Sequence, residues 1–177
     1  KDLRANFTQE QIEDLSLKIS NEILKLPIWD KNFYHIFLPI VPQKEINTEY
    51  ILHILQGKDK NIIISKSDFA TRKMQHFLLT DNTKILLNSY NIPEPVDGIE
   101  IPSSQIEVVF VPLLAYDVKG NRVGYGKGFY DQFLKDCKPN VIKIGLSLFE
   151  PEPMIEDIYK GDIKLDYCCT PFNIYAF

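Results

Sequence analysis

The stretch that most limits the possible folds of this chain is a glycine-rich loop set between an apolar run and a helical pattern. Four of the eight glycines fall within the segment Gly120–Gly128. The apolar run Val108–Val111 precedes this loop, and a helix-like segment begins at Phe129. Glycine lets the main chain adopt positive φ and approach a ligand closely, so successive N–H groups can converge on an anion at a helix N-terminus. The loop therefore predicts a phosphate site between a strand and a helix.

Alternating strand and helix patterns extend over the rest of the chain. Thr8 and Gln11 have the spacing of a capping box, and the apolar residues that follow recur at helical intervals until Pro27. This alternation predicts an α/β protein, with a sheet whose ligands bind outside the carboxyl ends of the strands. Strands are indicated at 34–38, 61–65, 74–79, 107–111 and 141–148 and helices at 48–55 and 129–137, while 91–102 has the composition of irregular turns.

Composition and charge exclude several classes of protein. With 45% hydrophobic and 25% charged residues, we expect one globular domain over residues 1–177. The net charge of -4, the pI near 5.4 and the lack of a basic cluster argue against a nucleic-acid partner. No apolar run approaches the roughly 18 residues of a membrane span. Cys137, Cys168 and Cys169 cannot all pair, which favours buried thiols in a reducing, cytoplasmic compartment.

The loop does not match the common nucleotide-binding motifs. A Walker A loop requires glycine where Asn121 stands and Ser or Thr where Gly128 stands, and the Rossmann fingerprint requires glycine in place of Phe129. Two cations remain, Arg122 and Lys127, and both side chains are suited to phosphate oxygens. A carboxylate one turn into the following helix, that of Asp131, is suited to Mg²⁺. The alternative is a glycine-rich turn whose charges are only solvated.

The segment Val111–Asp131 closely resembles the signature of the 5-formyltetrahydrofolate cyclo-ligase family. Weaker similarity occurs at Phe37–Pro39, Glu45–Glu49, Asn91–Pro95 and Asp162–Asp166, in the same order as in the family. The resemblance implies ATP-driven cyclisation of 5-formyltetrahydrofolate to 5,10-methenyltetrahydrofolate with release of ADP and phosphate. It also implies a three-layer α/β/α fold, with a largely parallel or mixed sheet similar to that of sugar-phosphate isomerases and CoA transferases.

The resemblance also assigns roles by motif position. Lys127 and Arg122 are the expected catalytic residues, and Asp131 and Asp162 the expected Mg²⁺ carboxylates, with Asp166 as the competitor of Asp162. The expected ATP-binding residues are Asn121, Arg122, Val123, Gly124, Tyr125, Gly126, Lys127, Gly128, Phe129 and Tyr130. The expected folate-binding residues are Leu38, Glu45, Tyr90, Tyr125, Gly126 and Phe129.

Other polar residues are expected to have structural roles. Asp117 is placed to shape the turn before the glycine loop. His35, His53 and His76 lack the spacing of a zinc site or a catalytic triad, so we expect them to be structural.

The chain also departs from the family pattern. Tyr90 stands where relatives often have Trp, and Phe129 where they usually have Tyr. The basic N-terminal pair with which relatives hold ATP has no match, because Lys1–Arg4 aligns with the stretch after it, and we expect a short native N-terminal segment to be absent. The missing basic pair and Phe129 keep open the alternative of a non-catalytic folate- or nucleotide-binding protein. A third alternative is another small-molecule phosphoryl-transfer or sugar-phosphate enzyme that uses a similar loop. We expect a monomer.

Overall fold

The computed structural model describes all 177 residues, from Lys1 to Phe177, and is built around a seven-stranded sheet. The strand order is β11-β10-β9-β6-β1-β2-β3. The five central strands are parallel, and the outer strands β3 and β11 pair antiparallel with their neighbours. The α/β prediction is therefore confirmed, with a mixed, mostly parallel sheet. The strands are β1 (Phe33–His35), β2 (Asn61–Asp68), β3 (Lys73–Leu78), β6 (Val108–Pro112), β9 (Ile142–Leu146), β10 (Tyr167–Cys169) and β11 (Ile174–Ala176).

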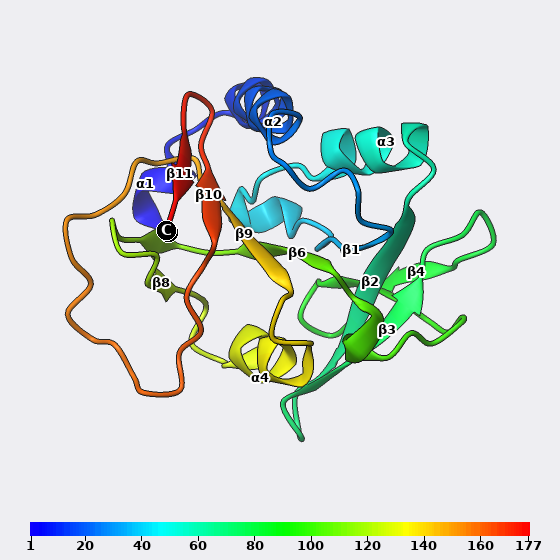
Figure 1. Cartoon of the computed structure of the whole chain (residues 1–177). Helices are drawn as coiled ribbons and strands as arrows, with labels where there is room; N and C mark the ends of the chain where they lie inside the picture. The colour runs from blue at the N-terminus through cyan, green and yellow to red at the C-terminus, as the bar shows by residue number, and fades with distance from the viewer.

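Helices cover both faces of this sheet. Figure 1 shows α2 (Gln9–Ile23) and α3 (Glu49–Gly57) on one face and α4 (Phe129–Asp136) on the other. Each face has its own buried apolar cluster: Ile19 and Leu55 belong to the first, and Phe133 belongs to the second. None of the helices has the length and apolar character needed to cross a lipid bilayer.

Local sequence signals account for the helix ends. The capping box of α2 forms as expected, because Thr8 accepts from the N–H of Gln11 while the Gln11 side chain accepts from the N–H of Thr8. Thr48 precedes α3, but its side chain does not cap the helix. Its hydroxyl donates instead to the carbonyl oxygen of Phe37 at 2.6 Å, so this residue ties α3 to the loop after β1.

Several short elements differ from the sequence prediction. The first strand covers Phe33–His35 instead of 34–38, and the region 91–102 is not wholly irregular, because it contains part of a two-stranded ribbon. The elements that were not predicted are α1 (Asp2–Ala5), η1 (Val41–Gln43), β4 (Ile85–Leu87), β5 (Pro93–Pro95), η2 (Ser103–Gln105), β7 (Ala115–Tyr116), β8 (Arg122–Val123), β10 and β11.

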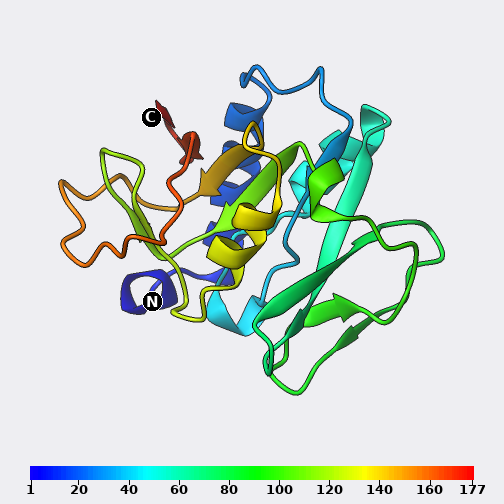
Figure 2. The same ribbon diagram turned by 60° about the horizontal axis from the view of Figure 1, so that its bottom comes forward.

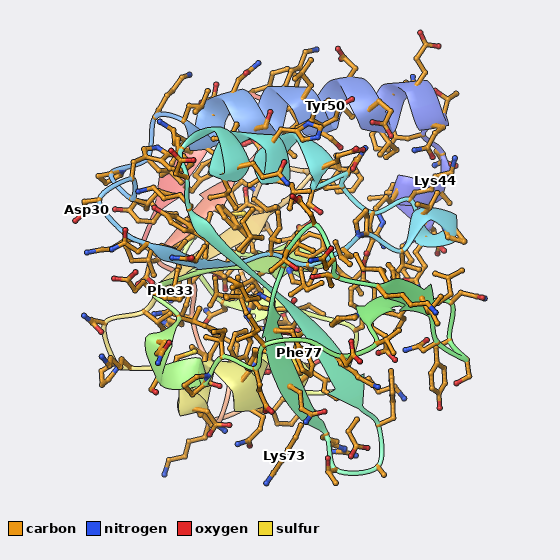
Figure 3. All side chains as sticks on the ribbon, turned by 90° about the vertical axis from the view of Figure 1, so that its right-hand side faces the viewer. Asp30, Phe33, Lys44, Tyr50, Lys73 and Phe77 are labelled. Atoms are coloured by element: carbon orange, nitrogen blue, oxygen red, sulfur yellow. The ribbon has the colours of Figure 1, made fainter.

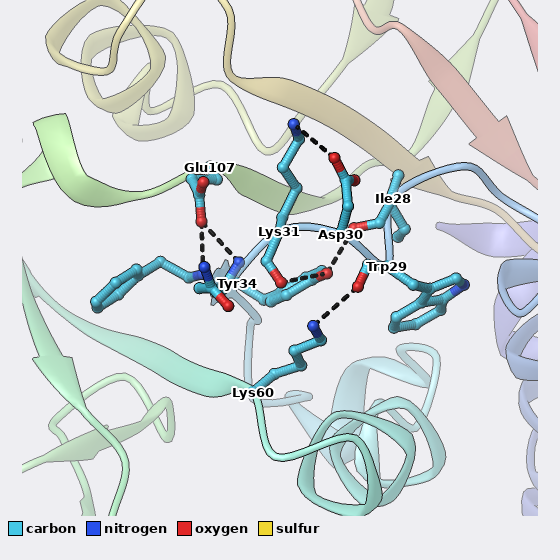
Figure 4. A network of polar contacts seen from close by, with 9 residues as sticks. Ile28, Trp29, Asp30, Lys31, Tyr34, Lys60 and Glu107 are labelled. Carbon is cyan, nitrogen blue, oxygen red and sulfur yellow. Dashed lines mark hydrogen bonds and ion pairs between the residues drawn. The ribbon is translucent and has the colours of Figure 1, made fainter.

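A polar network fixes the amino-terminal edge of the sheet (Figure 4). The carboxylate of Glu107 accepts hydrogen bonds from the N–H groups of Asn32 and Phe33, at 2.7 and 2.9 Å. The hydroxyl of Tyr34 donates to the carbonyl oxygen of Ile28 at 2.5 Å. These contacts hold the start of β1 beside β6 and leave the opposite edge of the sheet for other loops.

Four loops leave the carboxyl-terminal ends of neighbouring parallel strands. The loop after β1 carries Glu45, and the glycine loop follows β6. The β2–β3 turn and the segment 147–166 after β9 complete the set. Figure 2 shows the N-terminal helix α1 beside the chain near β8, so the first residues also reach this side of the molecule. The expected ligand-binding edge is therefore where the candidate residues gather.

Candidate active site

The glycine loop has the backbone conformation that its composition predicts. Gly126 and Gly128 have φ values of 80° and 71°, in the left-handed region that other residues rarely adopt. A Cβ atom at either position would meet open space, so the main chain here faces solvent and can be approached by a ligand. Gly128 is also the N-cap of α4, whose first N–H groups have no partner within the helix. The loop can therefore present main-chain donors to an anion.

A buried aspartate shapes the start of this loop. Asp117 is fully buried and accepts hydrogen bonds from the N–H groups of Lys119, Asn121 and Ile155. It also accepts from the side-chain amide of Asn121 at 2.9 Å. Burial on its own raises the pKa of Asp117, but these hydrogen bonds outweigh it and the net shift is downward. The turn-shaping role predicted for Asp117 is confirmed, and the Asn121 side chain serves the same turn.

The arginine of the loop is held by the expected metal carboxylate. Arg122 Nη2 lies 2.7 Å from Asp131 Oδ1, and the same oxygen accepts the N–H of Ile163 at 2.9 Å. The Arg122 side chain is only 5% exposed, and its Nε–H has no partner. Asp131 therefore joins the glycine loop to the segment after β9 through one oxygen and leaves its other oxygen without a protein partner.

A cleft of about 440 Å³ opens between α4, the β2–β3 turn and the segment after β9. Four of the residues assigned by motif position, Lys127, Gly128, Asp131 and Asp162, line this cleft. Asp162 uses one oxygen to accept the N–H of Tyr159. The other residues that line it are Thr71, Arg72, Lys73, Gln132, Lys135 and Gly161.

Three cations of this cleft were missed from the sequence. Arg72 and Lys73 lie on the β2–β3 hairpin, and Lys135 lies on α4. Figure 3 shows Lys73 at the end of the hairpin. No local pattern marks these residues, because only the fold brings the hairpin opposite α4. Arg72 has a positive φ of 58°, but this backbone feature is visible only in the structure.

The structure separates the two aspartates that competed for the metal. Asp162 lies on the cleft wall, whereas Asp166 accepts the N–H of Lys143 at 2.8 Å and pairs with its ammonium group at 2.9 Å. Asp166 therefore stabilises the pairing of β9 with the start of β10. The placement favours Asp162, and its metal role stays a prediction.

The expected folate carboxylate is buried and anchored. Glu45 is 6% exposed, and its Oε2 accepts the N–H of Ile40 at 2.7 Å. Its Oε1 accepts the hydroxyl of Tyr125, in the glycine loop, at 2.5 Å. Burial raises the pKa of Glu45, while the two hydrogen bonds and the charges of Arg4 and Lys1 act in the opposite direction.

Aromatic side chains form a wall near the start of α4. The rings of Phe69 and Tyr90 lie 4.3 Å apart, and Phe69 meets Phe129 edge-on at 5.1 Å. Tyr90 is 58% exposed, so a ligand can reach its ring. Phe69, which follows β2, was not predicted. Tyr130 instead packs its ring against Phe133, in the core beneath α4.

The remaining candidates are placed as follows. Leu38 is half-buried against the first apolar cluster, and Val123 lies exposed in β8. His35 and His76 are buried, and His53 lies on the exposed side of α3, so the structural roles expected of them stay predictions. All three cysteines are free and buried, as predicted.

Comparison with known proteins gives this geometry a context. The family model described as "5-formyltetrahydrofolate cyclo-ligase family" matches residues 1–150. A probable 5-formyltetrahydrofolate cyclo-ligase of Schizosaccharomyces pombe is 27% identical over 92% of this chain and 87% of its own length. The 5-formyltetrahydrofolate cyclo-ligase of Haemophilus influenzae is 30% identical over 82% of this chain and 79% of its own.

A solved structure agrees with these relatives. The NMR structure of the Aquifex aeolicus 5,10-methenyltetrahydrofolate synthetase superposes with a TM-score of 0.82 and 25% identity, covering 99% of this chain and 87% of that one. The sheet, the loops at its carboxyl edge and the glycine signature thus occur together along the matched length, and the chain belongs to the 5-formyltetrahydrofolate cyclo-ligase family.

Proposed function

We propose that this chain uses ATP to close 5-formyltetrahydrofolate to 5,10-methenyltetrahydrofolate, with release of ADP and phosphate. The observation that carries the proposal is the direct hydrogen bond between Tyr125 in the glycine loop and the buried Glu45, because it joins the expected nucleotide loop to the expected folate carboxylate. A reaction between the two substrates requires their binding elements to meet in this way.

The charge and shape of the cleft support a nucleotide there. Arg72, Lys73, Lys127 and Lys135 face Asp131 and Asp162, an excess of positive charge that suits a triphosphate. The open main chain at Gly126 and Gly128 adds N–H donors. The buried Nε–H of Arg122, which has no protein partner, is a further donor that a small shift of the side chain would expose.

The two cleft carboxylates also fit a magnesium ion. No three His, Cys, Asp or Glu side chains are close enough together to hold a metal ion by themselves. Mg²⁺, however, commonly takes one or two carboxylates together with substrate phosphates and water. Asp131 and Asp162 each engage one oxygen in the protein contacts described above and keep the other oxygen available. Bound there, Mg²⁺ would supply charge neutralisation of the phosphate oxygens.

The folate half of the site supplies one carboxylate and an aromatic wall. Glu45 accepts from one donor at each oxygen, so each oxygen retains acceptor capacity for the N–H groups of a pteridine ring. The rings of Tyr90 and Phe129, joined by Phe69, offer a stacking surface, and we assign Leu38 the remaining apolar contact.

The reaction requires alignment and charge neutralisation from the protein, without a covalent protein intermediate. The formyl oxygen bonds to the γ-phosphorus as the bond to ADP breaks. N10 then bonds to the activated carbon and releases its proton to solvent, the carbon–oxygen bond breaks, and phosphate leaves with the former formyl oxygen. In this scheme Lys127 follows the transferring phosphoryl group as a point charge, and Arg122, held by Asp131, fixes the glycine loop around it.

The wider expectations complete the proposal. We infer that the fold is a small member of the three-layer arrangement found in sugar-phosphate isomerases and CoA transferases. We also infer that the chain acts as a monomer in the cytoplasm, where free thiols such as its three cysteines persist.

The test is whether the methenyl product forms, and its ultraviolet absorbance is the quantity measured. The purified chain is mixed with 5-formyltetrahydrofolate, ATP and Mg²⁺, and omission of each component is the control. We expect product only when all three are present. Binding of both ligands without turnover would instead favour the non-catalytic binding protein, and turnover of a different phosphorylated substrate would favour another phosphoryl-transfer enzyme.

A further inference from the structure

The hydroxyl of Tyr125 lies between two buried charges that come from distant parts of the chain. Arg4 Nη2 lies 2.9 Å from this hydroxyl, and Glu45 Oε1 lies 2.5 Å from it. Arginine can only donate, and an ionised carboxylate can only accept. The hydroxyl therefore accepts from Arg4 and donates its own proton to Glu45, so the three groups form a chain with one direction.

Both charged ends of this chain are buried. Arg4 is 7% exposed and Glu45 is 6% exposed. A buried charge destabilises the protein unless its partners remain in place. Loss of the hydroxyl between these two charges therefore costs more free energy than loss of a surface hydrogen bond. Lys1 and Arg4 also lie over the Tyr125 ring, 5.3 and 5.8 Å from its centroid. The ring is therefore held from the side of α1 as well as by its hydroxyl.

The Glu45 carboxylate is oriented from two sides. The N–H of Ile40 holds Oε2 from the same loop, and Tyr125 holds Oε1 from the glycine loop. Without the hydroxyl, the carboxylate would be fixed at one oxygen only and could rotate away from a bound ring.

We propose that Tyr125 is a positioning residue, whose hydroxyl holds the Glu45 carboxylate in the orientation that binds the folate and ties it to the nucleotide loop. This inference rests on the folate role proposed for Glu45. It replaces the direct contact with both substrates that motif position assigns to Tyr125. Movement of the glycine loop around a nucleotide is then transmitted to the folate carboxylate through one hydrogen bond.

The charged and titratable groups around Glu45 make the proposal sensitive to pH. Lys1 and Arg4 of the N-terminal segment, Tyr125 of the glycine loop and Tyr130 of α4 all act on this carboxyl or are acted on by it. Burial raises the pKa of Glu45, and the Tyr125 hydroxyl is one of the groups that lower it. Loss of the hydroxyl therefore favours the protonated form, in which one oxygen carries a proton and the carboxyl no longer offers two charged acceptor oxygens to N–H donors.

The experiment compares wild type with Tyr125→Phe by equilibrium binding between about pH 5 and pH 8. For the variant we expect the Kd for 5-formyltetrahydrofolate to rise about tenfold, as for loss of a hydrogen bond to a charged group. The acid limb of its affinity profile should move to higher pH, and the Kd for Mg·ATP alone should change less than about twofold.

Two further variants make the test specific. Tyr50→Phe removes another hydroxyl that donates to a glutamate, Glu13 at 3.0 Å on α2, and should change neither ligand's affinity. Glu45→Gln should weaken folate binding and abolish its pH dependence, and adding Tyr125→Phe to it should cost little more, because both changes remove the same interaction.

A Tyr125→Phe profile parallel to wild type, or equal losses for folate and Mg·ATP, would show that Tyr125 only supports the loop and would overturn the inference. Additive effects of the two substitutions would also overturn it. A wild-type protein that forms no methenyl product would contradict the proposed function instead, so the two failures are distinguishable.

Discussion

The two cations of the glycine loop have different surroundings, which indicates different roles. Arg122 is buried and paired with Asp131 at 2.7 Å, so its position is fixed before any ligand arrives. Lys127 is exposed on the cleft wall and is free to reorient. A lysine ammonium on a flexible stem can follow a phosphoryl group as it moves between the two substrates.

Lys127→Ala should therefore lower kcat by about a hundredfold, a typical loss when one transition-state charge contact is removed. The Kd for 5-formyltetrahydrofolate should stay within about twofold of wild type, because the contact belongs to the moving group. Steady-state kinetics and folate titration measure the two quantities. Lys18→Ala on α2, whose ammonium group pairs with Asp14, is the control and should change neither. Equal losses in both quantities would remove Lys127 from the catalytic step.

Asp131→Asn should raise the Mg²⁺ concentration needed for half-maximal activity about tenfold or more, because a charged oxygen ligand is lost. The amide keeps an oxygen that can accept the N–H of Ile163, so the loop contact is disturbed less than the metal site. Asp166→Asn is the matched control, since Asp166 pairs with Lys143 and should affect stability without changing the Mg²⁺ titration. An unchanged titration for Asp131→Asn would exclude Asp131 as a ligand.

At the scale of elements, sequence patterns predicted the strands and helices that are long or strongly periodic. They failed for the β4–β5 ribbon, because Pro93 and Pro95 are typical of turns. Proline has no N–H to donate to a neighbouring strand, so it occurs in strands mainly at sheet edges, as in this two-stranded ribbon. The strands β10 and β11 are three residues each, and long-range pairing forms them, because β10 pairs with the edge of β9 and β11 pairs with β10. Such elements have no periodic signal, since long-range pairing defines them.

The two hydrogen bonds that Glu107 accepts at the start of β1 are a contact between elements, and they can be tested separately from the site. Glu107→Ala should lower the free energy of unfolding by about 1–3 kcal/mol, because two N–H groups at the start of β1 lose a charged acceptor. Denaturant titration measures this change. The kcat should stay unchanged, because these hydrogen bonds lie at the sheet edge opposite the cleft. Glu156→Ala, in the exposed segment after β9, should leave the unfolding free energy within about 0.5 kcal/mol of wild type.

At the scale of the whole molecule, a buried polar chain joins three strands beneath α4. Ser65 Oγ lies 2.7 Å from His35 Nε2 and 2.6 Å from His76 Nδ1, which connects β1, β2 and β3. Burial holds the pKa of His35 well below its usual value and lowers that of His76 to about 4, with the charge of Asp136 opposing the shift at His76. Both histidines are therefore neutral in the folded protein near neutral pH.

This network predicts the pH dependence of stability. The unfolded histidines gain protons below about pH 6.5 while the folded ones do not, so stability is complete above that pH and falls as the pH drops toward the folded pKa values. The expected slope is about 1.4 kcal/mol per pH unit for each histidine. Denaturant titrations from pH 7 to pH 5 measure it.

Two histidine variants identify the origin of this slope. His76→Asn should reduce the slope by about half, whereas His53→Gln on exposed α3 should leave it unchanged. An identical slope in wild type and His76→Asn would show that other groups cause the acid instability.

The sequence by itself determined the α/β class and the family signature, and it predicted a phosphate site at the loop Gly120–Gly128. These depend on local periodicity, on the backbone freedom of glycine and on a contiguous motif. Only the tertiary structure decided that Asp131 holds Arg122, that Arg72 and Lys73 face Lys127, and that Arg4, Tyr125 and Glu45 form one chain. The physical reason is that these contacts join segments far apart in the sequence. The packing of the sheet and its loops decides which of these segments are buried together and hydrogen-bonded, and the local residue pattern does not.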